Sequence, residues 1–348
     1  MRPLLLTLAI GFAAAPSYAG DLYYIQTGGD RNVYAVSVNA DTPRIVLASS
    51  EYTGNVVRGV TRYNHAGSNG QAFLQTTGNS LYNDPADIQL LWRGPDGAIS
   101  TKRITDLSAN TLLPYGFIIA QDDSFFSLKV HDFQGRNAIY RLNVSVDQAL
   151  AADYVPPTRY DDPRMTLVYS VFLDPKVGPN SLQHDWSGDG TRLVYENNYV
   201  NSTGTFMTGY FVKRLSDGAT VLLYETPYAT SQSLGIGLRW NPTSDQILQP
   251  YKDGSGIFML HADTPGLKTW ALQRRTYKNK TTVYTDSPDR PLWRFDGQAF
   301  AFALERTVQP NGGTATNEHY PSVTSGGWPS MNLTTTRPAK VYPIGWTP

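Results

Sequence analysis

Three tryptophans recur at nearly equal intervals in the second half of the chain, and each opens the same short phrase. Trp186, Trp240 and Trp293 are separated by 54 and 53 residues. A polar turn follows each tryptophan, and then an apolar run rich in strand-forming residues. A repeat of about 50 residues is typical of propeller blades, because each blade buries its faces only against its neighbours. This spacing constrains the fold more than any other feature of the sequence.

The rest of the chain carries the signals of an all-β protein. Runs rich in Val, Ile, Tyr and Phe extend from Leu22 nearly to the C-terminus, separated by turn dipeptides such as Asp217-Gly218 and Asp253-Gly254. Only Ser145 to Tyr154 favours a helix, of two or three turns. We therefore predict a β-propeller of six blades, each with four antiparallel strands. Five and seven blades are the alternatives, because the upstream copies of the phrase are weaker.

The two ends of the chain are expected to close this ring. The segment from Asp21 to Ala48 holds three strands without a preceding tryptophan phrase, and Val341 to Trp346 is a single strand at the far end. Pairing them in one sheet would remove two open edges, so residues 20–348 are predicted to form one domain. The segment from Thr307 to Lys340 is polar and rich in Gly, Pro, Ser and Thr. We expect it to be a long excursion over one face of the disc.

The first 19 residues have the pattern of a secretory signal peptide. Arg2 precedes an apolar run from Leu4 to Ala15, and small residues precede an expected cleavage after Ala19. The protein is therefore expected to be periplasmic or secreted, and no later segment is apolar enough to predict membrane insertion. The chain has no cysteine, and its 29 basic and 29 acidic residues balance. Disulfides and thiol chemistry are thus excluded, and no nucleic-acid partner is expected.

The repeated phrases resemble those of a known family. Trp186-Ser187-Gly188-Asp189-Gly190 and the strand after it resemble the W-S-P-D-G-x-x-I-A-F signature of TolB-type, WD-like β-propeller repeats. The equivalent residues of the other phrases are Trp240, Trp293, Asp296 and Gly297, whereas Asp245 is displaced. The resemblance implies that the tryptophans pack between blades and that Asp-Gly closes a hairpin. It also implies an extracytoplasmic propeller that binds proteins, glycans or small ligands, with lyase or lactonase chemistry in some branches. TolB-type proteins carry an α/β domain ahead of the propeller, and no such domain is expected here between the signal peptide and the first strands.

Few residues suggest chemistry. The five histidines, His65, His131, His184, His261 and His319, show no metal-binding spacing. No metal site or cofactor is therefore predicted, although a propeller could gather histidines from several blades around a divalent metal in its central channel. His184 and Asp185 are the candidate catalytic residues, because they precede Trp186 on what should be an innermost strand. The alternative for His184 is a structural histidine between blades, bonded to a backbone carbonyl.

The clusters of charge are interpreted as solvated. Asp122-Asp123 and Asp161-Asp162 are adjacent acids, and neighbours in a strand point to opposite faces, so neither pair is a ready dyad. Arg274, Arg275, Lys278 and Lys280 form a basic cluster that we expect in a solvated loop between strands, with an anion-binding patch as the alternative. No G-x-S-x-G elbow or glycine-rich phosphate loop is present, which disfavours serine hydrolases and nucleotide-dependent enzymes.

Two functional hypotheses remain open. The first is a non-enzymatic module that holds a protein or glycan partner on one face of the propeller. The second is a metal-dependent carbohydrate lyase or lactonase whose site lies in the central funnel, with His184 and Asp185 as candidates. Convergence of histidines and carboxylates from at least three blades at the axis would favour the enzyme.

Overall fold

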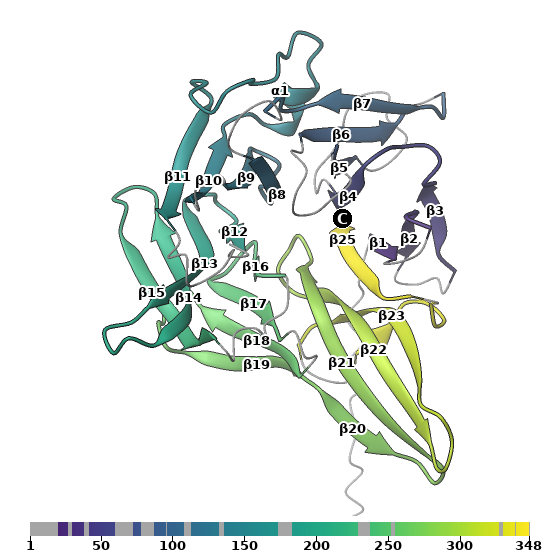
Figure 1. The fold of residues 1–348 in the computed structure, drawn as a ribbon. Coiled ribbons are helices and arrows are strands. Elements are labelled where there is room, and N and C mark those ends of the chain that lie inside the picture. Colours follow the sequence, from purple (N-terminus) through teal and green to yellow (C-terminus); the bar gives the residue numbers. More distant parts are fainter. Residues whose placement is uncertain are drawn as a thin grey trace, which may run out of the picture.

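The computed structural model shows an all-β protein in which six sheets follow one another around an axis (Figure 1). The residues that it describes are 20–26, 30–37, 42–59, 72–77, 87–94, 96–107, 113–131, 136–172, 183–228, 237–251, 255–326, 330–337 and 339–347. The predicted signal peptide, residues 1–19, lies outside this set. No helix among these residues is long and apolar enough to cross a membrane.

Each sheet is one blade, and in the first five blades the strands follow one another from the axis outward. The first blade contains β25 (Val341–Trp346), β1 (Asp21–Gln26), β2 (Val33–Ser37) and β3 (Arg44–Leu47). The second contains β4 (Asn55–Gly59), β5 (Phe73–Thr76), β6 (Ile88–Arg93) and β7 (Ile99–Arg103). The third contains β8 (Leu113–Ile119), β9 (Phe126–His131), β10 (Arg136–Leu142) and β11 (Met165–Phe172).

The remaining blades continue in chain order. The fourth contains β12 (His184–Trp186), β13 (Arg192–Val200), β14 (Phe206–Arg214) and β15 (Thr220–Pro227). The fifth contains β16 (Arg239–Trp240), β17 (Gln246–Pro250), β18 (Gly256–His261) and β19 (Lys268–Gln273). The sixth has five strands: β20 (Arg275–Lys278), β21 (Thr282–Trp293), β22 (Phe300–Pro310), β23 (Thr316–Thr324) and β24 (Met331–Asn332). The prediction of a six-bladed propeller is thus confirmed.

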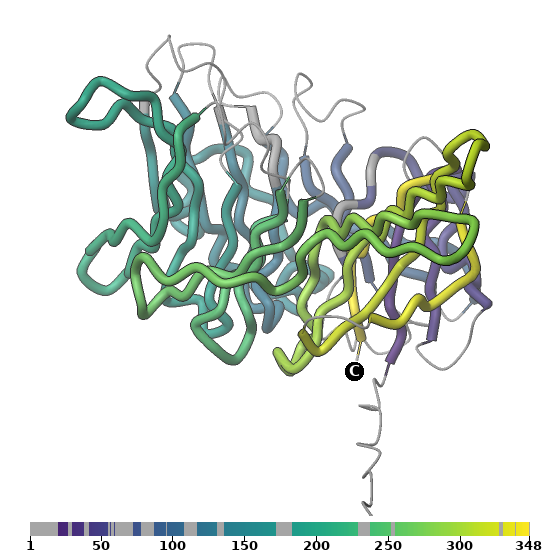
Figure 2. Tube along the Cα trace, turned by 90° about the horizontal axis from the view of Figure 1, so that it is seen from below, coloured from purple at the N-terminus to yellow at the C-terminus, as the bar shows by residue number. Residues whose placement is uncertain are grey.

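The last strand of the chain is the innermost strand of the first blade. β25 pairs antiparallel with β1, from Leu22 opposite Trp346 to Gln26 opposite Val341. Figure 2 shows the two strands side by side, β1 in purple and β25 in yellow. This pairing joins segments from opposite ends of the chain in one sheet. Neither β1 nor β25 therefore has an unpaired edge on the side that faces the other strand.

Two expectations for the C-terminal part were wrong. The segment from Thr307 to Lys340 is not an excursion over a face, because β22 continues through it to Pro310 and β23 and β24 follow in the same sheet. Arg275 to Lys278 form the strand β20 rather than a loop. Both segments are polar because this part of the sheet is largely exposed on its two faces. Without a buried face, a strand has no need of the apolar alternation that would reveal it in the sequence.

The one described helix is short. α1 spans Val146–Leu150 and begins with a capping box, in which Ser145 and Gln148 each bond the other's backbone. It ends at Ala151, whose backbone is no longer helical. The helix is thus shorter than the two or three turns expected for Ser145 to Tyr154.

The repeated tryptophans fill the space between blades. Trp186 is fully buried and packs with Phe125 of the preceding blade, their ring centroids 4.9 Å apart. Trp240 lies in a core cluster that joins the fourth and fifth blades, and Trp293 packs against one that joins the fifth and sixth. Each tryptophan therefore seals the boundary between its own blade and the one before it.

We predict that Trp186→Ala lowers the free energy of unfolding by about 3–5 kcal/mol, because it leaves a large cavity between two blades. Trp270→Ala is the matched control, since the Trp270 side chain is 45% exposed. Urea denaturation followed by circular dichroism measures both. Equal losses for the two variants would contradict the role assigned to Trp186.

Candidate binding site at the mouth of the channel

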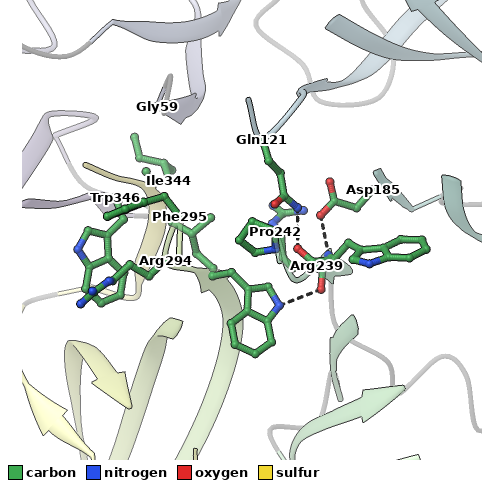
Figure 3. Close-up of a pocket in the computed structure, with 13 residues that line it drawn as sticks. Gly59, Gln121, Asp185, Arg239, Pro242, Arg294, Phe295, Ile344 and Trp346 are labelled. Atoms are coloured by element: carbon green, nitrogen blue, oxygen red, sulfur yellow. Dashed lines mark hydrogen bonds between the residues drawn. The ribbon is translucent and has the colours of Figure 1, made fainter. Parts of the chain in front are cut away.

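One pocket lies on the propeller axis and receives residues from all six blades. It is lined by the carboxyl ends of the innermost strands and by the turns that follow them: Gly59, Gln121, Asp185, Arg239, Trp240, Pro242, Leu292, Trp293, Arg294, Phe295, Ile344, Gly345 and Trp346. It encloses about 420 Å³, counting the part open to solvent. Figure 3 shows these side chains gathered around a common space. The pocket is therefore the mouth of the central channel, on the side of the repeated turns.

Trp346 belongs to the same repeat, although the sequence pattern did not lead us to predict it there. It ends β25 as Trp186, Trp240 and Trp293 end β12, β16 and β21. It lies 53 residues after Trp293, so its spacing alone could have identified it. The chain ends two residues later, and no Asp-Gly phrase follows to mark the repeat. The next strand of this blade, β1, comes from the other end of the chain.

The repeated turns have one geometry. Gly190 donates its amide hydrogen to the Ser187 carbonyl, and Gly297 donates to the Arg294 carbonyl in the same way. Both glycines have φ near +70°, at 66° and 69°. In this left-handed region glycine meets no steric penalty. The Asp-Gly dipeptides thus close the turns between β12 and β13 and between β21 and β22.

The pair Asp122-Asp123 is a third copy of this turn. Asp123 donates its amide hydrogen to the Ala120 carbonyl and has φ 60°, so it occupies the position of the glycine. Asp122 is exposed, and its Oδ1 accepts the amide hydrogen of Ser124, as Asp189 accepts that of Thr191. The pair is therefore a hairpin turn, but the interpretation as solvated holds only for Asp122, because Asp123 is buried. Asp161 and Asp162 likewise lie in a loop, where they pair with Arg159 and Arg164 at 2.9 and 2.8 Å.

Side chains from two other blades bind the backbone of Trp240. Asp185 Oδ2 accepts the Trp240 amide hydrogen at 2.8 Å, and Gln121 Nε2 donates to the Trp240 carbonyl at 2.6 Å (Figure 3). An innermost strand has no neighbour on its channel side, so its backbone groups there need other partners. Asp185, a candidate catalytic residue, is buried and supplies such a partner. Asp185 and Gln121 thus connect the fourth and third blades to the fifth blade through the backbone of Trp240.

Aromatic and cationic side chains form the open part of the mouth. Trp293 Nε1 donates to the Arg239 carbonyl at 3.3 Å, which fixes the indole against the fifth blade. Arg294 pairs with Asp296 of its own turn, and its guanidinium lies 5.6 Å from the centre of the Phe295 ring. Arg239 also lines the pocket. The mouth therefore offers flat apolar surfaces beside two guanidinium groups.

His184 lies between blades. Its side chain is buried, and Nε2 is 2.8 Å from the hydroxyl of Ser127 on β9. The partner of Nε2 is thus a side-chain hydroxyl of the third blade. Gln183, just before it, accepts the amide hydrogens of Gly237 and Leu238 at 2.9 and 3.2 Å.

The same interface between the third and fourth blades contains two buried ionisable side chains, Lys129 and Glu196. Burial lowers the pKa of Lys129 to about 8, an effect opposed by the negative charge of Glu196. Burial raises the pKa of Glu196 to about 7, opposed in turn by Lys129. Sequence reasoning missed both residues, because nothing in the strands β9 and β13 marks these positions as facing one another.

The other histidines do not join this group as far as the structure describes them. His261 Nδ1 lies 3.6 Å from Asp245 Oδ2 at the outer part of the fifth blade, and burial lowers the pKa of His319 on β23. His131 ends β9, and His65 lies outside the described residues. Among the described ranges, no three His, Asp or Glu side chains lie close enough to hold a metal ion. The convergence that the enzyme hypothesis requires is not seen in this part of the chain.

Comparison with known proteins gives similarity at the level of whole structures. No family model and no curated protein matches the sequence. A puromycin hydrolase matches with 12% identity and a TM-score of 0.48, over 88% of this chain and 49% of the other. An oligogalacturonate lyase from Vibrio parahaemolyticus has 10% identity and a TM-score of 0.39, over 87% and 74%. A β-propeller domain from Myceliophteria thermophila has 6% identity and a TM-score of 0.38, over 77% and 80%.

These similarities carry no conclusion about activity. The chain spans about half the length of the puromycin hydrolase that it matches. At such low identity, a shared fold does not transfer a site. Membership of the TolB-type family therefore stays a prediction. A proposal about function has to rest on the geometry of this chain.

We predict that the wild-type protein loses stability relative to Glu196→Gln as the pH rises from 5 to 7. Native Glu196 keeps its proton up to about pH 7, whereas an unfolded glutamate releases it near its ordinary pKa. Between these values the free energy of unfolding falls by up to about 1.4 kcal/mol per pH unit. Urea denaturation at pH 5, 6 and 7 measures the difference. The exposed variant Asp153→Asn controls for the loss of one negative charge, and parallel curves for wild type and Glu196→Gln would contradict the prediction.

Proposed function

We propose that this protein is an exported binding module whose channel mouth receives a segment of a protein partner. The observation that carries the proposal is the composition of the mouth, where the partly exposed side chains of Trp293 and Phe295 lie beside Arg239 and Arg294. Tryptophan and arginine are the residue types most enriched among the energetic centres of protein interfaces.

The positions of the polar residues support binding over catalysis. Asp185 and Gln121 bind the backbone of Trp240, and His184 contacts Ser127 between blades. A general acid or base must be within hydrogen-bond reach of a reacting atom. These side chains instead bond groups that hold the blades together, so they support a rigid rim around the mouth. A rigid rim loses little conformational entropy when a partner binds.

The charge of the mouth indicates which partner segment it favours. Arg294 has one carboxylate partner, Asp296, on its own turn, and Asp185 is committed to the Trp240 amide. A guanidinium can still donate to a second acceptor, since it carries five N–H groups in a fixed fork. We therefore propose a partner segment that combines an aromatic or aliphatic side chain with a carboxylate.

A photoreactive benzoylphenylalanine in place of Phe295 is expected to form a discrete covalent adduct with one protein in cells. The same residue at Val155, which is 68% exposed, is the control for surface contacts. Adding Arg294→Gln should reduce the adduct by roughly tenfold, if the arginine contributes about 1.4 kcal/mol. Mass spectrometry identifies the adduct, and thermal unfolding checks that the variant is folded. Absence of a protein adduct, or equal adducts at both positions, would sink the proposal.

Export is tested separately. We expect cell fractionation to find the protein outside the cytoplasm, with a mature N-terminus at Gly20 or Asp21. Replacing Leu6 and Leu8 by arginine would interrupt the apolar run on which recognition of a signal peptide depends. That variant should accumulate in the cytoplasm as the uncleaved chain. A mature wild-type protein that still begins at Met1 would show that residues 1–19 are not a cleaved signal.

A further inference from the structure

The sixth blade extends well beyond the rim of the disc (Figure 1). Its strands β21 and β22 have 12 and 11 residues, whereas no other described strand exceeds nine. We use the name arm for residues 274–286 and 306–317, which form the distal part of this blade. Its strands pair with one another and not with any other blade. The arm is therefore additional to what closure of the ring requires.

A buried carboxylate makes the arm rigid. Asp286 is fully buried and pairs with Arg275 at 2.9 Å and with Arg306 at 2.6 Å. Tyr277 and Tyr284, directly opposite on β20 and β21, stack with their ring centroids 5.1 Å apart and an interplanar angle of 13°. Arg275 also lies 5.1 Å from the centre of the Tyr277 ring. The strands of the arm are thus held in one geometry without support from the disc.

The arm carries a strong excess of positive charge in a chain whose net charge is zero. It contains the cations Arg274, Arg275, Lys278, Lys280 and Arg306, and its one acid is Asp286. Asp286 is occupied by Arg275 and Arg306. The other three cations are exposed, and the described residues place no carboxylate in ion-pair contact with them. Lys278 and Lys280 therefore bring positive charge to the tip, and Arg274 adds an exposed cation at the base of the arm. An anionic partner that lies along the arm would gain from all three.

The face of the arm opposite the tyrosines is a flat row of hydroxyl and amide groups. Thr276, Thr285, Thr307 and Asn317 are in register across the four strands. The Thr276 and Thr285 hydroxyls are 3.2 Å apart, and Thr307 donates to Asn317 at 3.1 Å. Such a row can exchange hydrogen bonds with the hydroxyl groups of a sugar chain. Tyr277, 39% exposed at the edge strand, adds an aromatic surface on the other face.

We propose that the arm binds an acidic polysaccharide, with Arg274, Lys278 and Lys280 contacting its sulfate or carboxylate groups. A lipid surface carries the same kind of charge, but interfacial binding also needs apolar side chains that enter the membrane. The tip of the arm, residues 278–282 and 310–315, consists of Lys, Asn, Thr, Pro, Gly and Ala. It offers hydrogen-bonding groups and cations without such an anchor, and the polysaccharide is therefore the favoured occupant.

Affinity electrophoresis of the full chain in gels that contain dextran sulfate, alginate or neutral dextran tests the proposal. Dextran sulfate or alginate should retard the protein, and neutral dextran should not. The triple variant Arg274→Gln, Lys278→Gln, Lys280→Gln should weaken retention at least about tenfold, and added salt should weaken it in the wild type. The matched control is Arg103→Gln, Arg159→Gln, Arg214→Gln, which removes the same charge from exposed sites elsewhere and should retain wild-type retardation.

Three results would overturn the proposal. An equal loss of retardation in the two triple variants would show that binding responds only to the overall charge of the protein. Retardation by neutral dextran and by neither acidic polysaccharide would exclude a role for the cations. Flotation with phosphatidylglycerol vesicles, combined with no retardation by either acidic polysaccharide, would assign the arm to a lipid surface. Because the arm and the mouth are separate, the arm variant should leave the adduct at position 295 unchanged. Failure of one proposal is therefore distinguishable from failure of the other.

Discussion

The structure depends on the packing of each blade against the next one. A four-stranded blade has two faces and no core of its own, so its apolar side chains are buried only when the neighbouring blades are present. The tryptophans that end the innermost strands carry much of this burial, and Trp186 and Trp240 are almost completely removed from solvent. The pairing of β25 with β1 extends the same requirement around the whole ring. A chain of this kind stays folded because every boundary between blades is filled.

The arrangement that fills these boundaries also shapes the mouth of the channel. Innermost strands expose backbone amide and carbonyl groups toward the axis, and these groups need partners. Asp185 and Gln121 meet this need at Trp240, while the indole of Trp293 bonds the carbonyl of Arg239. Residues that look like candidates for chemistry in the sequence are thus part of the support of the rim. The other side chains at the mouth form an aromatic surface with two arginines, Arg239 and Arg294. Such a surface suits recognition of a partner.

The sixth blade shows where pattern reasoning stops working. Its extended strands were expected as a loop and an excursion, since they lack the alternation of apolar and polar residues that a half-buried strand has. The arm is stabilised by other means, by Asp286 between Arg275 and Arg306 and by the stacked tyrosines. Those contacts join residues that are 11 and 20 positions apart across strands. A local window of sequence cannot reveal them, because strand register decides which side chains meet.

By itself, the sequence determined the fold class, favoured six blades over five or seven, and located the turns that follow Trp186, Trp240 and Trp293, because these follow from spacing and from local turn chemistry. The period even extends to Trp346, and the left-handed turn at Asp123 follows the same pattern as Gly190 and Gly297. Only the tertiary structure decided which residues converge. Asp185 and Gln121 are 64 residues apart, and Lys129 and Glu196 are 67 apart, yet each pair meets at a boundary between blades. Their meeting depends on how neighbouring blades are rotated about the axis, and no local property of the chain encodes that rotation.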